Sequence, residues 1–323
     1  MMKRIMVTGA LGQIGSDLVA KLRQVYGVEA VLATDIRQIQ HETVQSGPFR
    51  TLDVTDHQAF HEAAKEHRAD TIIHLAALLS AKAESNPALA WNLNMGGLLN
   101  ALETARALSC QFFTPSSIAA FGADTPKRAT PQDTLQRPLT MYGVSKVSGE
   151  LLCDYYYHKF GVDTRGLRFP GLISHSAPPG GGTTDYAVEM YVDAICSGSY
   201  TSYIDKGTYL DMMYMPDAIS AIMTLMEADP AKLKHRNAFN VTAMSVDPEG
   251  IAASIRRHIP DFSLDYNVDP VRQAIANEWP DSIDATAARE EWGFDVQYDL
   301  NHMTDDMVSK LMEKPQADQS KIS

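Results

Sequence analysis

The fold is decided by the stretch Arg4-Ile5-Met6-Val7-Thr8-Gly9-Ala10-Leu11-Gly12-Gln13-Ile14-Gly15. Its first five residues form the short apolar run expected of a buried parallel strand, and an amphipathic helical pattern follows to about Tyr26. The glycines are spaced G-x-x-G-x-x-G across the turn. Glycine allows a tight turn and close approach to a pyrophosphate, and the helix N-terminus presents free N–H groups and a positive dipole end. The alternative interpretation is that these glycines only shape the turn between a strand and a helix. However, the first strand–helix turn is the place where a dinucleotide-binding fold requires glycines.

The second expected strand, residues 29–34, ends at an acidic residue. Asp35 lies about 20 residues beyond the last glycine, where a carboxylate accepts the hydroxyl groups of an adenine ribose. A carboxylate there repels a 2′-phosphate, so the sequence predicts NAD rather than NADP; a solvated strand-end aspartate is the competing interpretation. Leu52-Asp53-Val54 ends a third short strand, and its spacing brings Asp53 beside the adenine.

The remaining pattern predicts an α/β fold. Strands at 70–77, 111–114 and 164–168 alternate with helices at 56–67, 86–109 and 141–160. This regular alternation predicts a Rossmann-type, doubly wound parallel sheet with helices on both faces. Ligands bind at the carboxyl ends of such strands, where Leu75-Ala76-Ala77 leaves room for a cofactor and Ser80 and Ser117 can face a substrate. His74 is interpreted as a strand residue satisfied by its neighbours.

After Gly171 the pattern changes, so we expect residues 1–171 to bind the cofactor and 172–323 to form mainly a smaller α/β substrate lobe, with some chain returning to the sheet. Helices are expected at 185–197, 211–228, 248–258 and 299–310, with short strands near Tyr203 and Tyr209-Leu210. The glycine-rich stretch 178–184 is interpreted as a lid or a plain connecting loop. Trp279, in the loop 278–282, walls a small pocket or plugs the junction of the two lobes.

Composition limits the class of function. The net charge of −12 argues against nucleic acid or an anionic membrane as a partner. Three widely spaced cysteines form neither a metal-binding nor a disulfide pattern, which indicates no metal and a reducing compartment. No apolar run reaches the roughly 18 residues of a membrane span. The first residues enter a strand directly, so we expect no leader peptide and a cytoplasmic location.

The segment Tyr142-Gly143-Val144-Ser145-Lys146 lies in the expected helix 141–160. A spacing of four places Tyr142 and Lys146 on one helix face, with their Cβ atoms about 5–6 Å apart. A phenol is a poor base at neutral pH, but a neighbouring ammonium favours the phenolate and lowers its pKa. Such a tyrosine takes the proton of a substrate hydroxyl while hydride leaves the same carbon. Tyrosine and lysine at this spacing also occur on exposed helices, so the pair alone is a weak signal.

Together these features resemble the extended short-chain dehydrogenase/reductase family over nearly the whole chain, and they imply its UDP-galactose-epimerase-like architecture. The resemblance implies that Tyr142 is the general base, that Lys146 binds the nicotinamide ribose and that Ser117 contacts the substrate oxygen; Ser116 is a near competitor. The implied cofactor is NAD, and the implied cofactor-binding residues are Gly9, Leu11, Gly12, Gln13, Ile14, Asp35, Ile36, Arg37, Asp53, Val54, Leu75, Ala76, Ala77, Asn94, Tyr142, Lys146 and Phe169.

Within that family the nearest resemblance is to short-chain-type L-threonine 3-dehydrogenases. It is carried by the Tyr142–Lys146 motif and by the segments 167–174, 179–187 and 279–284. Pro170 stands where nucleotide-sugar epimerases usually carry an asparagine. The implied reaction converts L-threonine and NAD to 2-amino-3-oxobutyrate and NADH. The implied substrate-binding residues are Ser80, Ser117, Tyr142, Gly182, Thr184 and Trp279.

Two alternatives remain at this point. A nucleotide-sugar epimerase or dehydratase would keep the same tyrosine and lysine but retain its NADH between half-reactions. A non-catalytic NAD-binding regulator would tend to lose one of the two residues. The resemblance also implies a homodimer through the helices 86–109 and 141–160.

Overall fold

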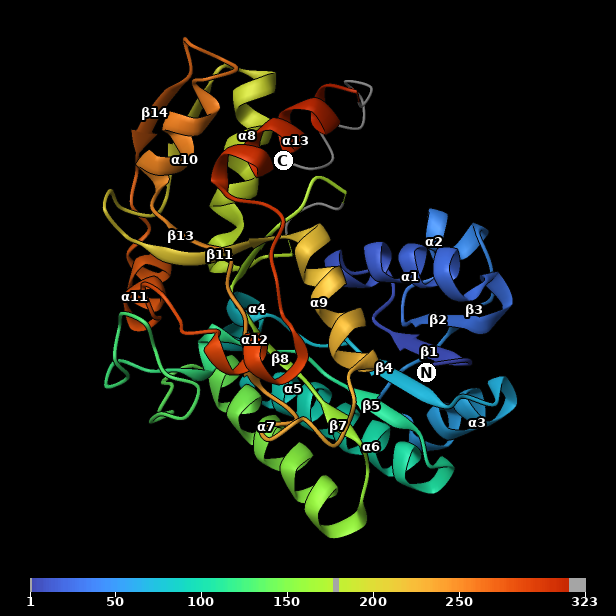
Figure 1. The fold of residues 1–323 in the computed structure, drawn as a ribbon. Coiled ribbons are helices and arrows are strands. Elements are labelled where there is room, and N and C mark those ends of the chain that lie inside the picture. Colours follow the sequence, from blue (N-terminus) through green and yellow to red (C-terminus); the bar gives the residue numbers. More distant parts are fainter. Residues whose placement is uncertain (1, 177–179, 314–323) are drawn as a thin grey trace.

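The computed structural model describes residues 2–176 and 180–313, which form an α/β fold around a six-stranded parallel sheet (Figure 1). In spatial order the strands are β3 (Phe49–Thr51), β2 (Val31–Asp35), β1 (Ile5–Thr8), β4 (Thr71–His74), β5 (Gln111–Phe113) and β7 (Thr164–Arg165). The strand order reverses direction between β1 and β4, which is the switch point where open parallel sheets bind ligands. The expected doubly wound sheet is therefore present.

Helices cover both faces of this sheet (Figure 1). On one face α3 (His57–His67), α6 (Gly97–Leu108) and α7 (Met141–Phe160) share a buried apolar cluster with the strands. On the other face α1 (Gln13–Tyr26) packs beside α9 (Met215–Glu227), which comes from the second half of the chain. The sheet core is thus completed by residues far apart in sequence.

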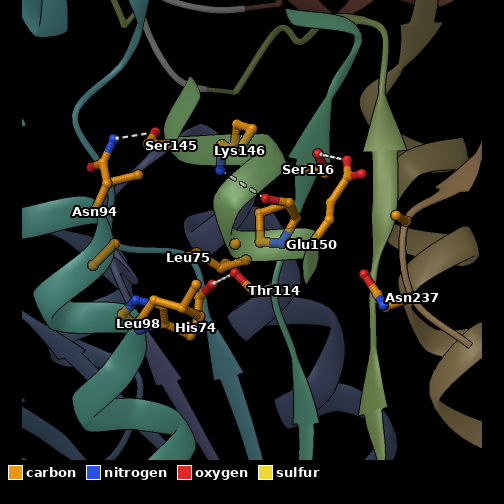
Figure 2. Close-up of a pocket in the computed structure, with 15 residues that line it drawn as sticks. His74, Leu75, Asn94, Leu98, Thr114, Ser116, Ser145, Lys146, Glu150 and Asn237 are labelled. Carbon is orange, nitrogen blue, oxygen red and sulfur yellow. Dashed lines mark hydrogen bonds between the residues drawn. The ribbon is translucent and has the colours of Figure 1, made fainter. Parts of the chain in front are cut away.

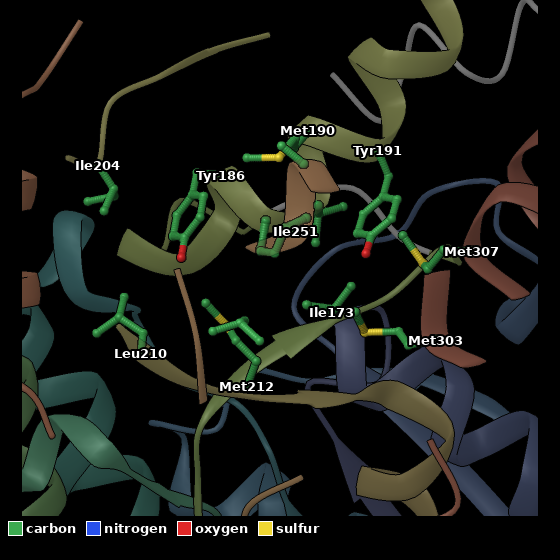
Figure 3. Packing of buried hydrophobic residues seen from close by; sticks show 14 of the residues in the cluster. Ile173, Tyr186, Met190, Tyr191, Ile204, Leu210, Met212, Ile251, Met303 and Met307 are labelled. Atoms are coloured by element: carbon green, nitrogen blue, oxygen red, sulfur yellow. The ribbon is translucent and has the colours of Figure 1, made fainter. Parts of the chain in front are cut away.

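A second apolar core lies in the C-terminal half. Here α8 (Tyr186–Cys196), α10 (Pro248–Ile255) and α13 (Leu300–Met312) pack together, and Figure 3 shows Tyr191 and two methionines of α13 in their midst. The hydroxyl groups of Tyr191 and Thr304 lie 2.7 Å apart, so this buried phenol is satisfied. A two-stranded parallel sheet, β10 (Ser199–Ser202) with β14 (Ser263–Tyr266), borders this core.

Two three-stranded sheets connect the halves. In the first, β8 (Leu167–Phe169) pairs with β6 (Ser116–Ser117) and with β12 (Phe239–Asn240). In the second, β11 (Leu210–Tyr214) lies between β9 (Gly171–Ile173) and β13 (Met244–Val246). The remaining helices are α2 (Glu42–Gln45), α4 (Ser80–Ser85), α5 (Pro87–Trp91), α11 (Pro270–Glu278) and α12 (Thr286–Trp292).

Three expected elements differ from the structure. The helix expected at 211–228 is a strand as far as Tyr214, because these residues are buried on both faces and pair with β9 and β13. Helix α9 then begins at Met215, with Pro216 in its first turn. The single helix expected at 86–109 is divided by a π-helical turn, Asn92–Gly96. The strand expected at 164–168 breaks at Gly166, where a Cβ atom would lie 2.6 Å from the carbonyl oxygen of Thr114.

The glycine turn is fixed by backbone contacts that leave no room for a side chain. A Cβ atom on Gly15 would lie 2.3 Å from the carbonyl oxygen of Gly9. Gly9 itself has φ = +66° and would place a Cβ atom 2.8 Å from the amide nitrogen of Ala76. Since backbone atoms cannot rotate away, close packing of β1, α1 and the chain after β4 requires glycine here.

We predict that Gly15→Ala lowers the free energy of unfolding by about 1–3 kcal/mol through overpacking, as measured by urea denaturation. Gly96→Ala is the matched control, because its added methyl group would meet its nearest atom, Asn92 Oδ1, at 3.5 Å. The control is expected to be at least as stable as the wild type. A Gly15→Ala variant of unchanged stability would contradict the close approach described here.

Candidate active site

A cavity of about 160 Å³ opens at the carboxyl ends of the central strands. It brings together twelve of the residues predicted from sequence, which are Gln13, Ile14, Leu75, Ala77, Ser80, Ser117, Tyr142, Lys146, Phe169, Gly182, Thr184 and Trp279. These residues come from α1, the chain after β4, β6, α7, β8, the turn before α8 and the end of α11. Every residue predicted to contact the substrate therefore lines one cavity.

The start of α7 positions Tyr142 beside Ser117. Thr140 caps the helix by accepting a hydrogen bond from the Gly143 amide at 3.1 Å. A Cβ atom on Gly143 would lie 2.2 Å from the carbonyl oxygen of Ala119. Only glycine lets the helix touch the short 3-10 turn, Ile118–Ala120, that follows Ser117.

The two neighbouring serines have different surroundings. The Ser116 hydroxyl donates to the buried carboxylate of Glu150, which also forms an ion pair with Arg168. Ser117 lines the cavity and forms a hydrogen bond with Tyr142. Of the two, Ser117 is thus placed to contact a reacting oxygen.

The pKa values of the tyrosine–lysine pair are governed mainly by burial. Lys146 Nζ donates to the carbonyl oxygen of Pro115 at 2.7 Å and lies 5.3 Å from the centre of the Tyr142 ring. Burial raises the pKa of Tyr142 to about 12, and the hydrogen bond with Ser117 acts in the opposite direction. Burial lowers the pKa of Lys146 to about 8, opposed by the charge of Glu150. Burial therefore decides the net direction of the shift at Tyr142, and a lowering of its pKa by Lys146 remains a prediction.

A second, smaller cavity of about 30 Å³ lies behind Lys146 (Figure 2). Asn94 borders it, accepts from the Leu78 amide at 2.8 Å and donates to Ser145 Oγ at 3.2 Å. Asn94 thus joins the chain after β4 to α7. His74 also borders the cavity; Nδ1 lies 2.9 Å from Thr8 Oγ1, and burial lowers the pKa of the ring to about 3, so the ring is neutral.

The glycine turn fits a dinucleotide. The first N–H groups of α1 receive no side-chain cap from Gly12. Gln13 Nε2 is buried at the edge of the larger cavity and has no hydrogen-bond partner among the residues that the structure describes. A buried donor and an uncapped helix N-terminus are the groups that a pyrophosphate satisfies. Gly9 and Gly15 already require bare backbone here, so the residues present match the predicted cofactor.

Asp35 lies at the end of β2 with its side chain almost fully buried. It accepts from the Leu11 amide at 3.1 Å and pairs with the guanidinium of Arg37 at 2.9 Å. Burial alone would raise the pKa of Asp35, but the hydrogen bonds from Arg37 and Leu11 lower it below its ordinary value. The carboxylate is therefore ionised and able to accept ribose hydroxyl groups.

Eight residues predicted to bind the cofactor lie outside the linings of both cavities. Five of them belong to the glycine turn and the end of β2, namely Gly9, Leu11, Gly12, Asp35 and Arg37, and the other three are Ile36, Asp53 and Val54. Asp53 accepts from the amide and hydroxyl groups of Thr55, at 2.9 and 2.7 Å, and so stabilises its own turn. The Val54 side chain is buried and lies against Gly97, where an added Cβ atom would meet it at 2.8 Å. The Ile36 side chain is exposed. The contact of these three residues with an adenine remains a prediction.

Sequence reasoning missed Asp185. This buried carboxylate lines the substrate cavity and accepts from the amides of Gly181 and Gly182 at 2.8 and 2.6 Å, so it holds the glycine turn in place. Burial raises its pKa. The signal was available, because an aspartate three residues after Gly182 is the pattern of a helix cap. Pro178 and Pro179, part of the predicted lid, lie outside the described residues.

In the described ranges 2–176 and 180–313, we find no cluster of histidine, cysteine, aspartate or glutamate able to hold a metal ion. Across those same residues, no helix is both long and apolar enough to cross a membrane.

Comparison with known proteins identifies the family. A sequence profile of the NAD dependent epimerase/dehydratase family matches residues 5–242. The chain belongs to this family. It is 62% identical to an uncharacterized epimerase/dehydratase of Staphylococcus aureus (strain USA300) over 97% of this chain and 98% of that protein. The family uses NAD, so the predicted cofactor and the extended short-chain dehydrogenase/reductase fold are confirmed.

Solved structures of similar sequence point to a narrower group. An L-threonine dehydrogenase from Clostridium difficile is 61% identical, with a TM-score of 0.96, over 100% of this chain and 99% of that chain. A monomeric L-threonine 3-dehydrogenase from a metagenome is 43% identical, with a TM-score of 0.90, over 94% of this chain and 97% of that chain.

We predict that Asp35→Ser lowers the preference for NAD over NADP by roughly 10-fold or more, because it removes a repelling charge and frees Arg37 for a 2′-phosphate. Isothermal titration of both dinucleotides gives the ratio of dissociation constants. Asp53→Ser, which removes an equal charge from the neighbouring turn, is expected to leave the ratio unchanged. An unchanged ratio in Asp35→Ser would remove this residue from the ribose site.

Proposed function

We propose that this protein is an L-threonine 3-dehydrogenase that oxidises the side-chain hydroxyl of L-threonine with NAD, giving 2-amino-3-oxobutyrate and NADH. The observation that carries the proposal is the single cavity in which Tyr142, Lys146 and Ser117 meet the polar groups of Ser80 and Thr184. High similarity to dehydrogenases of known structure supports the same substrate.

Each residue has a role that its surroundings support. NAD supplies the hydride acceptor when it is bound. Tyr142 removes the proton of the substrate hydroxyl. Ser117, whose hydroxyl is hydrogen-bonded to the phenol of Tyr142, holds the reacting oxygen. Lys146 is held by Pro115 at the edge of both cavities, where its ammonium group orients the ribose. Fixing base and substrate in one cavity supplies much of the rate.

The cavity also suits the two charged ends of an amino acid. Among its described lining residues, Asp185 supplies the carboxylate and Lys146 the ammonium group. We propose that the Asp185 carboxylate lies beside the ammonium group of the substrate. Ser80 and Thr184 supply hydroxyl groups, and Gly182 supplies backbone, for the carboxylate end. Trp279 supplies an apolar wall of the cavity.

The rival function, epimerisation or dehydration of a nucleotide sugar, is less well supported. Pro170 lines the cavity at the position where such enzymes usually carry an asparagine, and proline offers neither a side-chain amide nor a backbone donor. A non-catalytic NAD-binding regulator is less well supported still, since both Tyr142 and Lys146 are retained in the cavity.

The proposal also assigns roles to the two parts of the chain and a location in the cell. Residues 1–171 bind NAD and carry the catalytic pair, and residues 172–323 mainly shape the substrate side while returning α9 and β12 to the first half. The buried thiols of Cys110 and Cys153 fit a reducing cytoplasm. The proposed reaction places the protein in threonine catabolism.

The protein forms a homodimer in this proposal. The neighbouring helices α5, α6 and α7 expose apolar side chains, which are Leu89, Trp91, Leu99, Val144, Leu151 and Tyr155. Leu151 is 64% exposed, and residues 144, 151 and 155 share one face of α7. An exposed apolar face of this kind suits a two-fold interface. Because one similar dehydrogenase is described as monomeric, the assembly needs a direct test.

The function is tested by assaying L-threonine, L-serine, D-threonine and simple alcohols, each with NAD and with NADP, and following absorbance at 340 nm. L-Threonine with NAD is expected to give the highest kcat/KM. Tyr142→Phe is expected to lower turnover by roughly 10²–10⁴-fold while NAD affinity is retained, because only the base is lost. Tyr155→Phe removes a hydroxyl from the exposed face of the same helix and serves as the control. If no substrate in the panel releases NADH, the proposed function fails.

The dimer is tested by light scattering during gel filtration. Leu151→Lys places a charge in the proposed interface and is expected to convert the dimer to a monomer. Val271→Lys, at a position 67% exposed on α11, is the control and is expected to leave the mass unchanged. A wild-type protein that is monomeric at micromolar concentration would refute the interface.

A further inference from the structure

Trp279 reaches the substrate cavity from a segment that has no regular secondary structure of its own. We call residues 279–284, between α11 and α12, the Trp279 loop. Trp279 is 7% exposed and Ile283 is 5% exposed, so the loop is buried at both ends. A buried loop needs partners for its backbone groups, and those partners decide where Trp279 stands.

One set of partners lies on the segment 127–130, which leads toward the catalytic helix α7. The amides of Asp281 and Ser282 donate to the carbonyl oxygen of Lys127, at 2.8 and 3.1 Å. The amide of Thr130 donates to Ser282, and the amide of Asp284 donates back to Thr130, both at 2.9 Å. Thr130 and Ile283 therefore lie side by side as in a short parallel sheet. The Trp279 loop is thus paired with a segment that precedes α7 along the chain.

The Lys127 side chain reinforces the same join. Its ammonium group donates to the carbonyl oxygen of Trp279 at 2.8 Å and also to that of Asn277. These carbonyls lie at the C-terminus of α11, where helix hydrogen bonding ends and the dipole is negative. A partly buried cation is thus bonded to the backbone of the very residue that walls the cavity.

An opposite charge holds the other end of the loop. Asp211, on β11, is 1% exposed and accepts from the Ile283 amide at 2.5 Å and from Thr242 Oγ1 at 2.7 Å. Burying a carboxylate is costly unless its oxygens are satisfied. Here both oxygens are satisfied, and one of their two partners is the Trp279 loop itself.

We propose that Lys127 and Asp211 form a clasp that fixes the Trp279 loop against the substrate and so sets substrate affinity. Both are positioning residues, because neither lines the cavity and each acts through the backbone next to Trp279. The substrate in this statement is the amino acid of the proposed function. The segment 127–130 precedes α7 along the chain, so the clasp also joins the substrate wall to the part of the chain that leads to Tyr142.

The experiment compares Lys127→Met with Arg128→Met. Both lose one positive charge, but Arg128 is 91% exposed and lies 3.8 Å from Asp281. Lys127→Met is expected to raise KM for L-threonine roughly 10-fold, while kcat and the dissociation constant of NAD stay within about twofold. Arg128→Met is expected to match the wild type. Equal loss of kcat, NAD affinity and substrate affinity in Lys127→Met would indicate a general structural role and overturn the clasp.

Asp211 is tested by its isostere. In Asp211→Asn the amide oxygen still accepts from Ile283, and the amide nitrogen donates to Thr242, so KM is expected within about threefold of wild type. Asp211→Ala removes both bonds and is expected to raise KM roughly 10-fold. Assays at about pH 8.5 keep the wild-type carboxylate ionised, because burial raises its pKa to about 7. An Asp211→Ala variant with unchanged KM would overturn the clasp.

A fluorescence measurement separates the clasp from the proposed function. Acrylamide quenching of Trp279 is obtained by subtracting the signal of the matching Trp279→Phe variant, since the chain has two other tryptophans. Quenching is expected to increase in Lys127→Met and Asp211→Ala but not in Arg128→Met. This readout needs no substrate, so failure to oxidise L-threonine would refute the proposed function alone. Unchanged quenching in both clasp variants would refute the clasp alone.

Discussion

The contact between the start of α7 and the turn after β6 is the constraint on which the site depends. A missing Cβ atom at Gly143 lets the helix meet the carbonyl oxygen of Ala119, and Thr140 fixes the helix start at that place. The side chain of residue 142 is thereby brought beside residue 117, although the two are distant in sequence. One helical turn later, Lys146 reaches the same cavity because of the helix period alone. Two of the proposed catalytic positions thus follow from one backbone contact.

Burial at this contact has an electrostatic consequence. In the protein alone the phenol of Tyr142 is harder to ionise than in water, and the ammonium of Lys146 is easier to deprotonate. Both shifts oppose the charged forms, which is the signature of desolvation rather than of mutual attraction. The cavity is therefore a poor place for isolated charge. Polar groups that face it gain most from a ligand that supplies matching hydrogen bonds.

The first half of the fold is predicted well from sequence, because recognisable residues mark the ends of several strands and the starts of several helices there. Gly9 to Gly15, Asp35 and the Tyr142 motif all fall where the structure has a strand end or a helix start. Prediction fails where tertiary burial outweighs local pattern. Residues 211–214 look helical because they precede a helical run, but they are buried on both sides between β9 and β13. The pKa of Tyr142 could not be predicted either, since spacing fixes the distance to Lys146 but not the loss of water around the pair.

The partners of Trp279 were beyond the sequence for another reason. Their contacts join residues that are separated by up to 152 positions, as in the bond from Lys127 to Trp279, and no local periodicity records such a pairing. The second half of the chain is shaped by these long-range contacts. Its helix α9 completes the sheet core, its strand β12 pairs with β8, and its loop at 279–284 is held by a segment of the first half. Each half of the chain therefore supplies part of the other's packing, and the loop at 279–284 is bonded to the segment that precedes α7. The cavity therefore depends on both halves of the chain, and we expect that a change far from Tyr142 can alter substrate affinity without touching the reacting atoms.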